Sequence, residues 1–256
     1  MTTDDEGAGR SIKSVRNAFD VVEYLRESGA STATEVSEAL DVPLSTAHIY
    51  LQTLQETGYV RREDDAYRIG LRFLDLGGFA RHTLDLYHAA KQEITKLATE
   101  TDEVANLGVE ENGLRVLLHK AEAPEGIYDN PPIGQFTRMH WTSLGKAILS
   151  TMSPERVESV VERHGLPRAT ENTITTLDGL RRELEETRDR GYSIEDEERR
   201  EGIRALGVPI AAEGSATTVA AISVSGPRNR LLDKEAEVVE ALENAANVIE
   251  LRYKHY

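Results

Sequence analysis

Residues 32–60 read TATEVSEALDVPLSTAHIYLQTLQETGYV, and this stretch decides the fold of the first part of the chain. Ser31 or Thr32 precedes the first helical pattern, and either hydroxyl is suited to cap a helix N-terminus. Pro43 begins a second pattern, because the first turn of a helix tolerates a residue without an N–H. Two short helices with so tight a connection predict a helix-turn-helix.

The flanking segments extend this prediction on both sides. Upstream, apolar residues recur every three or four positions, which indicates one further helix with a single apolar face. These residues are Ile12, Val15, Phe19, Val22 and Leu25. Downstream, residues 59–62 and 67–69 are short β-prone runs around the acidic turn 63–65. A hairpin in that place predicts the winged form of the helix-turn-helix.

The predicted helix over residues 43–58 is the candidate reader of the DNA major groove. It carries no charged residue from Val42 to Gln55, although 29% of the chain is charged. Carboxylates are therefore absent where phosphates would approach. The candidate DNA-binding residues are Ser45, Thr46, His48, Tyr50 and Gln52 on this helix, and Lys13, Arg16, Arg61, Arg62 and Arg68 around it. The alternative is a helical bundle whose third helix lacks charge by coincidence and whose arginines are solvated.

Three motifs in this half resemble the IclR family of transcriptional regulators: SVRNAFDVVEYL, the stretch over residues 32–60, and YRIGLRFLDLG. The resemblance implies a winged helix-turn-helix that binds an operator in double-stranded DNA. One position departs from the family pattern. Ile49 stands where the family commonly has an arginine after the histidine of the recognition helix, which puts operator sequence and affinity in question.

A helical pattern over residues 71–101, with Gly77 and Gly78 as an expected interruption, connects the two halves. It is interpreted either as a linker that packs against a second copy or as a core helix of the second half.

In the second half, helical and strand patterns are interspersed, and Asn112-Gly113 is a strong hairpin signal. Strands are expected at 104–109, 114–121, 192–195, 206–211 and 218–225, and helices at 142–152, 153–164, 176–191 and 233–256, the last capped by Asp233. This order favours an α+β fold over a doubly wound parallel sheet.

The family resemblance continues through MHWTSLGKAIL, residues 170–175 and AAISVSGP, and covers about residues 11–250. It implies a GAF-like domain that binds a small organic effector, often a carboxylate or an aromatic acid. It also implies a linker that contributes to dimerisation. The matching effector-binding positions are Ser143, Leu144, Gly145, Glu195, Ala205, Ser223 and Ser225. Ala205 departs from the cysteine or serine that the family often has, so the effector is expected to differ.

The residues themselves support such a pocket. Ser223 and Ser225 alternate along a predicted strand, so both hydroxyls face one side. Backbone N–H groups at the start of the helix over residues 142–152 favour an anion. A metal site built from His119 and His140 with Glu195 or Asp196 is a weaker alternative.

Composition limits the remaining functions. The 256 residues include 30 Lys and Arg, 45 Asp and Glu and no cysteine, for a net charge of −15. Disulfides, thiolate metal sites and a cysteine nucleophile are excluded. So large a negative charge argues against binding nucleic acid or membrane by bulk charge, and it suits a protein of a high-salt cytoplasm. Two other functions stay open, namely an enzyme in which Ser143 and His140 act as nucleophile and base, and a pure oligomerisation module.

The sequence thus predicts four segments: a disordered tail over 1–10, a winged helix-turn-helix over 11–70, a helical linker over 71–101 and a GAF-like domain over 102–256. We expect a cytoplasmic, homodimeric regulator, or a dimer of such dimers. It should have no catalytic residue, no metal and no cofactor, and its DNA binding should respond to a small metabolite.

Overall fold

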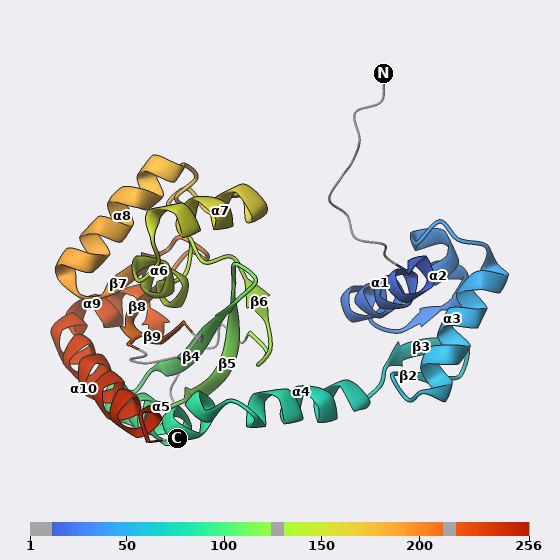
Figure 1. Cartoon of the computed structure of the whole chain (residues 1–256), viewed down its shortest axis with the longest axis horizontal. Coiled ribbons are helices and arrows are strands. Elements are labelled where there is room, and N and C mark those ends of the chain that lie inside the picture. Colours follow the sequence, from blue (N-terminus) through green and yellow to red (C-terminus); the bar gives the residue numbers. More distant parts are fainter. Residues whose placement is uncertain (1–11, 124–130, 212–218, 256) are drawn as a thin grey trace. The chain divides into compact units, whose positions relative to one another are not determined.

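The structure is a computed structural model that describes residues 12–123, 131–211 and 219–255. The chain forms two units, divided between Ala80 and Arg81 (Figure 1). The predicted tail over residues 1–10 lies outside the described residues. Within the described part, no helix has both the length and the apolar character that a bilayer crossing requires.

Unit 1 consists of short helices and a small sheet. Its elements are α1 (Lys13–Ser28), β1 (Ser31–Thr32), α2 (Ala33–Ala39), α3 (Leu44–Glu56), β2 (Val60–Glu63) and β3 (Ala66–Ile69). Thr32 is the cap of α2: its hydroxyl accepts from the Glu35 N–H, and the Glu35 carboxylate accepts from the Thr32 N–H at 2.7 Å. This reciprocal pair is a capping box, which stabilises the first turn. Pro43, predicted as the first residue of this helix, is its N-cap, one residue before the observed start of α3.

The core of unit 1 confirms the helix-turn-helix packing but buries only two of the five residues of the predicted stripe on α1. Val22 and Leu25 are buried, whereas Ile12, Val15 and Phe19 are 68%, 51% and 61% exposed. The remaining core comes from α1, α2, α3 and the wing: Val21, Ala33, Val36, Ala47, Leu51, Val60 and Tyr67. Helix α1 therefore carries more apolar residues than the core of unit 1 buries.

The wing is an antiparallel sheet in the order β1-β3-β2. Arg61 lies opposite Arg68, and Asp64 adopts a positive φ of 53° in the turn between β2 and β3. Aspartate tolerates this left-handed conformation better than most residues. The acidic turn predicted from the sequence is thus the tip of the wing.

The helical segment after the wing is two helices, α4 (Arg72–His82) and α5 (Asp85–Thr101). The predicted interruption at Gly77 and Gly78 is wrong, because α4 continues through both. A glycine in a helix costs only about 1 kcal/mol relative to alanine, which does not by itself break a helix. The break falls at Leu84, whose backbone is extended. No residue of α4 is buried, whereas α5 buries one whole side in the core of unit 2.

Unit 2 is a six-stranded antiparallel sheet with helices on both faces, in the strand order β6-β5-β4-β9-β8-β7. Its further elements are β4 (Val104–Glu111), β5 (Leu114–Glu122), β6 (Phe136–Thr137), α6 (Ser143–Ser150), α7 (Pro154–His164), α8 (Leu177–Arg190), β7 (Ser193–Asp196), β8 (Ile203–Ile210), β9 (Ala220–Pro227), α9 (Arg228–Asp233) and α10 (Glu235–Tyr253). Helices α5 and α10 cover one face, and α6 lies on the other beside α7 and α8 (Figure 1).

Two local predictions in unit 2 have opposite outcomes. Asn112 and Gly113 adopt positive φ values of 55° and 82°, so the Asn-Gly hairpin is confirmed. Asp233 does not cap the final helix, because it is the last residue of α9 and α10 begins at Glu235 without a side-chain cap. The short helix α9 carries no periodic signal long enough to separate it from α10 in the sequence.

Helix α6 lies close to its surroundings because of two glycines, one within the helix and one on the strand beneath it. A methyl group on Gly145 would come within 2.2 Å of the Met139 carbonyl oxygen. One on Gly207 of β8 would come within 3.1 Å of the Ser143 backbone. This close approach fixes the start of α6 directly above the sheet.

Candidate functional site

A small polar cavity lies between the start of α6 and the face of the sheet beneath it. Its volume is about 40 Å³. Because one water occupies about 10–15 Å³ by this measure, the space holds roughly three waters. It is lined by Asn106, Arg115, Leu117, Pro131, Thr142, Ser143, Leu144, Glu195, Arg199, Ile203, Ala205, Ser223 and Ser225.

The strand register brings these side chains together from five strands. Asn106 on β4 lies opposite Ser223 on β9, and Ala205 on β8 lies opposite both Ser225 and Glu195. The Asn106 amide donates to the Ser225 hydroxyl at 3.2 Å. Neighbouring positions on each strand point to the opposite face, where they form the apolar core under α5 and α10.

The N-terminus of α6 is satisfied within the protein. The Thr142 hydroxyl accepts from the Gly145 N–H at 3.0 Å, and a backbone hydrogen bond from Ser143 reaches Glu195. Ser193 donates its hydroxyl proton to the Ser143 carbonyl at 2.7 Å. The helix start therefore has less capacity for an outside anion than its position in the sequence indicates.

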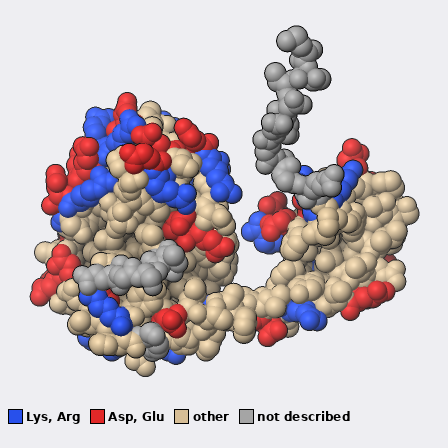
Figure 2. Space-filling model, in the orientation of Figure 1, with Lys and Arg blue, Asp and Glu red and all other residues tan. Residues whose placement is uncertain are grey.

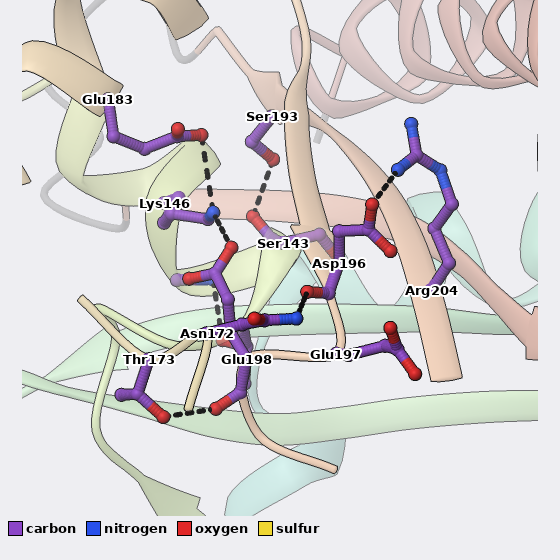
Figure 3. Close-up of polar contacts among 12 residues, drawn as sticks. Ser143, Lys146, Asn172, Thr173, Glu183, Ser193, Asp196, Glu197, Glu198 and Arg204 are labelled. Carbon is purple, nitrogen blue, oxygen red and sulfur yellow. Dashed lines mark hydrogen bonds and ion pairs between the residues drawn. The ribbon is translucent and has the colours of Figure 1, made fainter. Parts of the chain in front are cut away.

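Behind the cavity, Lys146 is fully buried and lies between two carboxylates (Figure 3). Its Nζ is 2.5 Å from Glu198 Oε1 and 3.2 Å from Glu183 Oε1. The loop that carries Glu198 is held by threonines, of which Thr173 donates to the Glu198 carbonyl at 2.6 Å. A buried ammonium requires such pairing, because its desolvation is costly.

Glu195 is 4% exposed and lies beside this cluster. Burial raises its pKa to about 8, and the nearby Glu198 charge adds to that rise. Lys146, the backbone hydrogen bond from Ser143 and the charge of Arg115 act in the opposite direction but do not cancel it. Burial therefore favours the neutral acid form of Glu195 near neutral pH.

Six of the seven predicted effector positions line the cavity: Ser143, Leu144, Glu195, Ala205, Ser223 and Ser225. Gly145 does not, because it packs on the Met139 backbone. Sequence reasoning missed Asn106, Arg115 and Arg199. A charged residue inside the apolar run of β5 is the signal that identifies Arg115. Arg199 lies within a run of charges and has no such signal.

The alternative sites find no support in the geometry. Among the described residues, no three His, Asp or Glu side chains are grouped to hold a metal. His119 packs on the Tyr87 ring with centroids 5.6 Å apart, whereas His140 Nε2 lies 3.1 Å from the Pro167 carbonyl. His140 therefore points to a backbone oxygen and not to Ser143.

On α3, the exposed side chains form one face. Ser45, His48 and Gln52 are exposed together with Ile49, at the spacing of successive helical turns. Figure 2 shows the side of unit 1 that carries α3 as mostly uncharged. Thr46 and Tyr50 are half-buried, and the Tyr50 hydroxyl accepts from the Asn17 amide at 3.2 Å. Tyr50 therefore braces α3 against α1.

The predicted arginines of the wing are engaged with the wing's own acids. Arg61 and Arg68 lie 3.0 Å and 2.9 Å from the Glu63 carboxylate. Arg62 donates to the Asp64 carbonyl and lies 3.5 Å from Asp65. Lys13 and Arg16 on α1 are exposed. Exposed pairs of this kind are weak, so phosphates can compete for the arginines.

Known proteins resemble this chain over both units. Residues 79–251 match the family model described as bacterial transcriptional regulator IclR C-terminal, and residues 14–64 match the IclR helix-turn-helix domain. The probable HTH-type transcriptional regulator ArcR of Halobacterium salinarum is 33% identical over 255 residues, which are 97% of this chain and 96% of the relative.

Solved structures of IclR proteins also align with this chain over nearly its whole length. The Thermotoga maritima IclR aligns with a TM-score of 0.76 and 26% identity, over 95% of this chain and 99% of that one. An IclR homolog from Microbacterium hydrocarbonoxydans, complexed with 4-hydroxybenzoate, aligns with a TM-score of 0.79 and 25% identity, over 95% and 98% of the two chains.

The raised pKa of Glu195 predicts a pH-dependent stability. Between pH 4.5 and about 8 the unfolded chain ionises this carboxyl and the folded chain does not, so the free energy of unfolding falls as pH rises and levels off above that window. Glu195→Gln removes this loss. Its free energy of unfolding relative to wild type should rise from pH 5 to pH 8 by more than about 1.4 kcal/mol, the equivalent of one pKa unit.

Denaturant titrations at fixed salt measure this difference, with the exposed Glu201→Gln as the control for loss of one carboxyl. A difference between Glu195→Gln and wild type that stays constant from pH 5 to pH 8 would show that Glu195 is ionised in the folded protein.

Proposed function

The chain belongs to the IclR family of transcriptional regulators, and on this basis we propose that α3 reads an operator while the cavity under α6 holds the controlling effector. The proposed DNA-binding region extends over residues 11–70, the linker over 71–101 and the effector domain over 102–256. The observation that carries the proposal is a polar cavity in unit 2 of a chain whose unit 1 is a winged helix-turn-helix.

DNA recognition is assigned to the uncharged face of α3. Ser45, His48 and Gln52 supply hydrogen-bonding groups for base edges or phosphates. Thr46 at the start of α3 and the arginines of α1 and the wing, Arg16, Arg61, Arg62 and Arg68, together with Lys13, position the helix through phosphates. Tyr50 supports the helix from behind.

A homodimer is supported by exposed apolar side chains of unit 1. Phe19 on α1 and Leu71, Leu74 and Phe79 in and beside α4 are 61–74% exposed. Three of these four lie between residues 71 and 79, and apolar surface concentrated along one segment in this way marks an interface with another protein. Two copies would present two recognition helices to a near-palindromic site.

The acidic composition suits a protein that acts at high salt concentration. The net charge is −15, and a relative comes from Halobacterium salinarum. Salt screens the repulsion between the acidic surface and DNA, so contact is expected at the carboxylate-free face of α3 and at the basic side chains around it.

A carboxylate on that face should abolish tight DNA binding. We expect Ser45→Glu to lower the affinity for a duplex selected from a random library at least tenfold, by repulsion of phosphates. Thr99→Glu on α5 makes the same charge change at an exposed position of unit 2 and is the matched control. Fluorescence anisotropy measures both. Equal losses, or no sequence selected by the wild type, would contradict the assignment.

Leu74→Ser tests the proposed dimer surface, which consists of Phe19, Leu71, Leu74 and Phe79. Leu74 is 73% exposed. We expect sedimentation equilibrium to show a dimer for wild type and a dissociation constant at least about tenfold higher for the variant. Ile49→Ser, at a comparably exposed position on the DNA-binding face, should leave the dimer intact. A monomeric wild type, or equal effects of both substitutions, would exclude this surface.

A further inference from the structure

Ile49 is a large apolar side chain on the outward face of α3, and it is 63% exposed. It lies two positions from both Ala47 and Leu51, which are fully buried. Because a helix turns about 100° per residue, two positions correspond to about 200° around its axis. Ile49 therefore points almost directly away from the core of unit 1.

The neighbours of Ile49 on this face are polar. Ser45 precedes it by four positions and Gln52 follows it by three, so both lie beside it on adjacent turns. His48 flanks the same face, and all three side chains are exposed. Ile49 thus lies among hydrogen-bonding side chains, and it is not part of the proposed dimer surface, which belongs to α1 and to the segment over residues 71–79.

Exposure of one apolar side chain is common on protein surfaces and carries no function by itself. The position of Ile49 is what matters, because the outward face of the second helix in a helix-turn-helix is the one that enters the major groove. Helix formation does not require isoleucine there, since a β-branched residue is a weaker helix former than leucine or alanine.

The conformation of Ile49 is suited to recognition. Its backbone carbonyl accepts from the Thr53 hydroxyl at 2.8 Å within α3. In a helix, a β-branched side chain keeps one strongly preferred χ1 rotamer. Ile49 therefore presents a rigid apolar surface that loses little rotamer freedom when it is covered.

The base edges in the major groove determine what such a surface can contact. They carry hydrogen-bond donors and acceptors, and thymine adds one apolar group, its C5-methyl. An isoleucine placed against donors or acceptors alone would remove their water without replacing the hydrogen bonds, which is unfavourable. Against a thymine methyl, the same side chain buries apolar surface on both partners, which is favourable.

We propose that Ile49 reads a thymine in each half-site of the operator, through contact of its side chain with the C5-methyl group. The inference rests on the proposed function, which assigns α3 as the recognition helix, and it names the base contact at the centre of that helix. The sequence-based choice of DNA-binding residues missed Ile49, because it considered groups that hydrogen-bond or carry charge.

Fluorescence anisotropy of the full chain tests this contact on a duplex that the wild type selects from a random library. Each thymine is replaced in turn by deoxyuridine, which lacks the C5-methyl and keeps the base pair. At the thymine that Ile49 contacts, we expect the wild-type affinity to fall about fourfold, the factor that burial of one methyl group contributes. Ile49→Ser should bind the thymine and deoxyuridine duplexes equally at that position.

Three controls isolate the methyl contact. Ile49→Leu keeps the size and apolar character of the side chain, so it should retain the dependence on the methyl group. The other thymines of the duplex report what deoxyuridine does to the DNA itself, and there the wild type and Ile49→Ser should change alike. Because Ile49 is exposed, both variants should melt near the wild-type temperature. If Ile49→Ser binds too weakly to measure, Ile49→Ala takes its place.

The outcomes separate this inference from the proposed function. Ile49 does not read a thymine if no deoxyuridine weakens the wild type, or if Ile49→Ser loses as much affinity as the wild type at every thymine. The recognition role of α3 would then stand or fall by Ser45→Glu and its control Thr99→Glu. If the wild type selects no sequence at all, both the role of α3 and the thymine contact are overturned.

Discussion

The ion pair of Lys146 with Glu198 determines the charge balance under α6. The ammonium is fully buried, and it takes the Glu198 carboxylate at 2.5 Å and the Glu183 carboxylate at 3.2 Å. Burial and then the Glu198 charge raise the pKa of the neighbouring Glu195 to about 8. Two nitrogen atoms of Arg115, which lines the cavity, are buried without a hydrogen-bond partner among the described residues.

The close position of α6 on the sheet depends on glycine at two places. Gly145 lies against the Met139 backbone, and Gly207 allows β8 to approach the start of α6. This contact holds Ser143 over the sheet, where it meets the β7 residues Ser193 and Glu195. A movement of α6 caused by a ligand would therefore be transmitted to both the sheet and the Lys146 cluster.

The fold could be predicted well from the sequence where local signals are strong. The Thr32 cap, the Asn112-Gly113 hairpin and the alternation of Ser223 and Ser225 all depend on near neighbours in the chain. The errors at Gly77 and Gly78, and at Asp233, arise because packing and backbone geometry decide where a helix breaks. Within the candidate site, the sequence could not predict that Arg199 lines the cavity. Its position depends on a loop that is held by Thr170 and Thr173, which are distant in the sequence.

Regulation requires that the two proposed sites be coupled, and coupling is a difference in DNA affinity between the ligand-bound and ligand-free protein. The most direct measurement is the dissociation constant of the wild-type chain for its selected duplex, with and without a saturating concentration of the ligand that fits the cavity. We expect a change of at least about fivefold in either direction, which Ser223→Leu abolishes because leucine fills the cavity. Identical affinities with and without a ligand shown to occupy the cavity would contradict it.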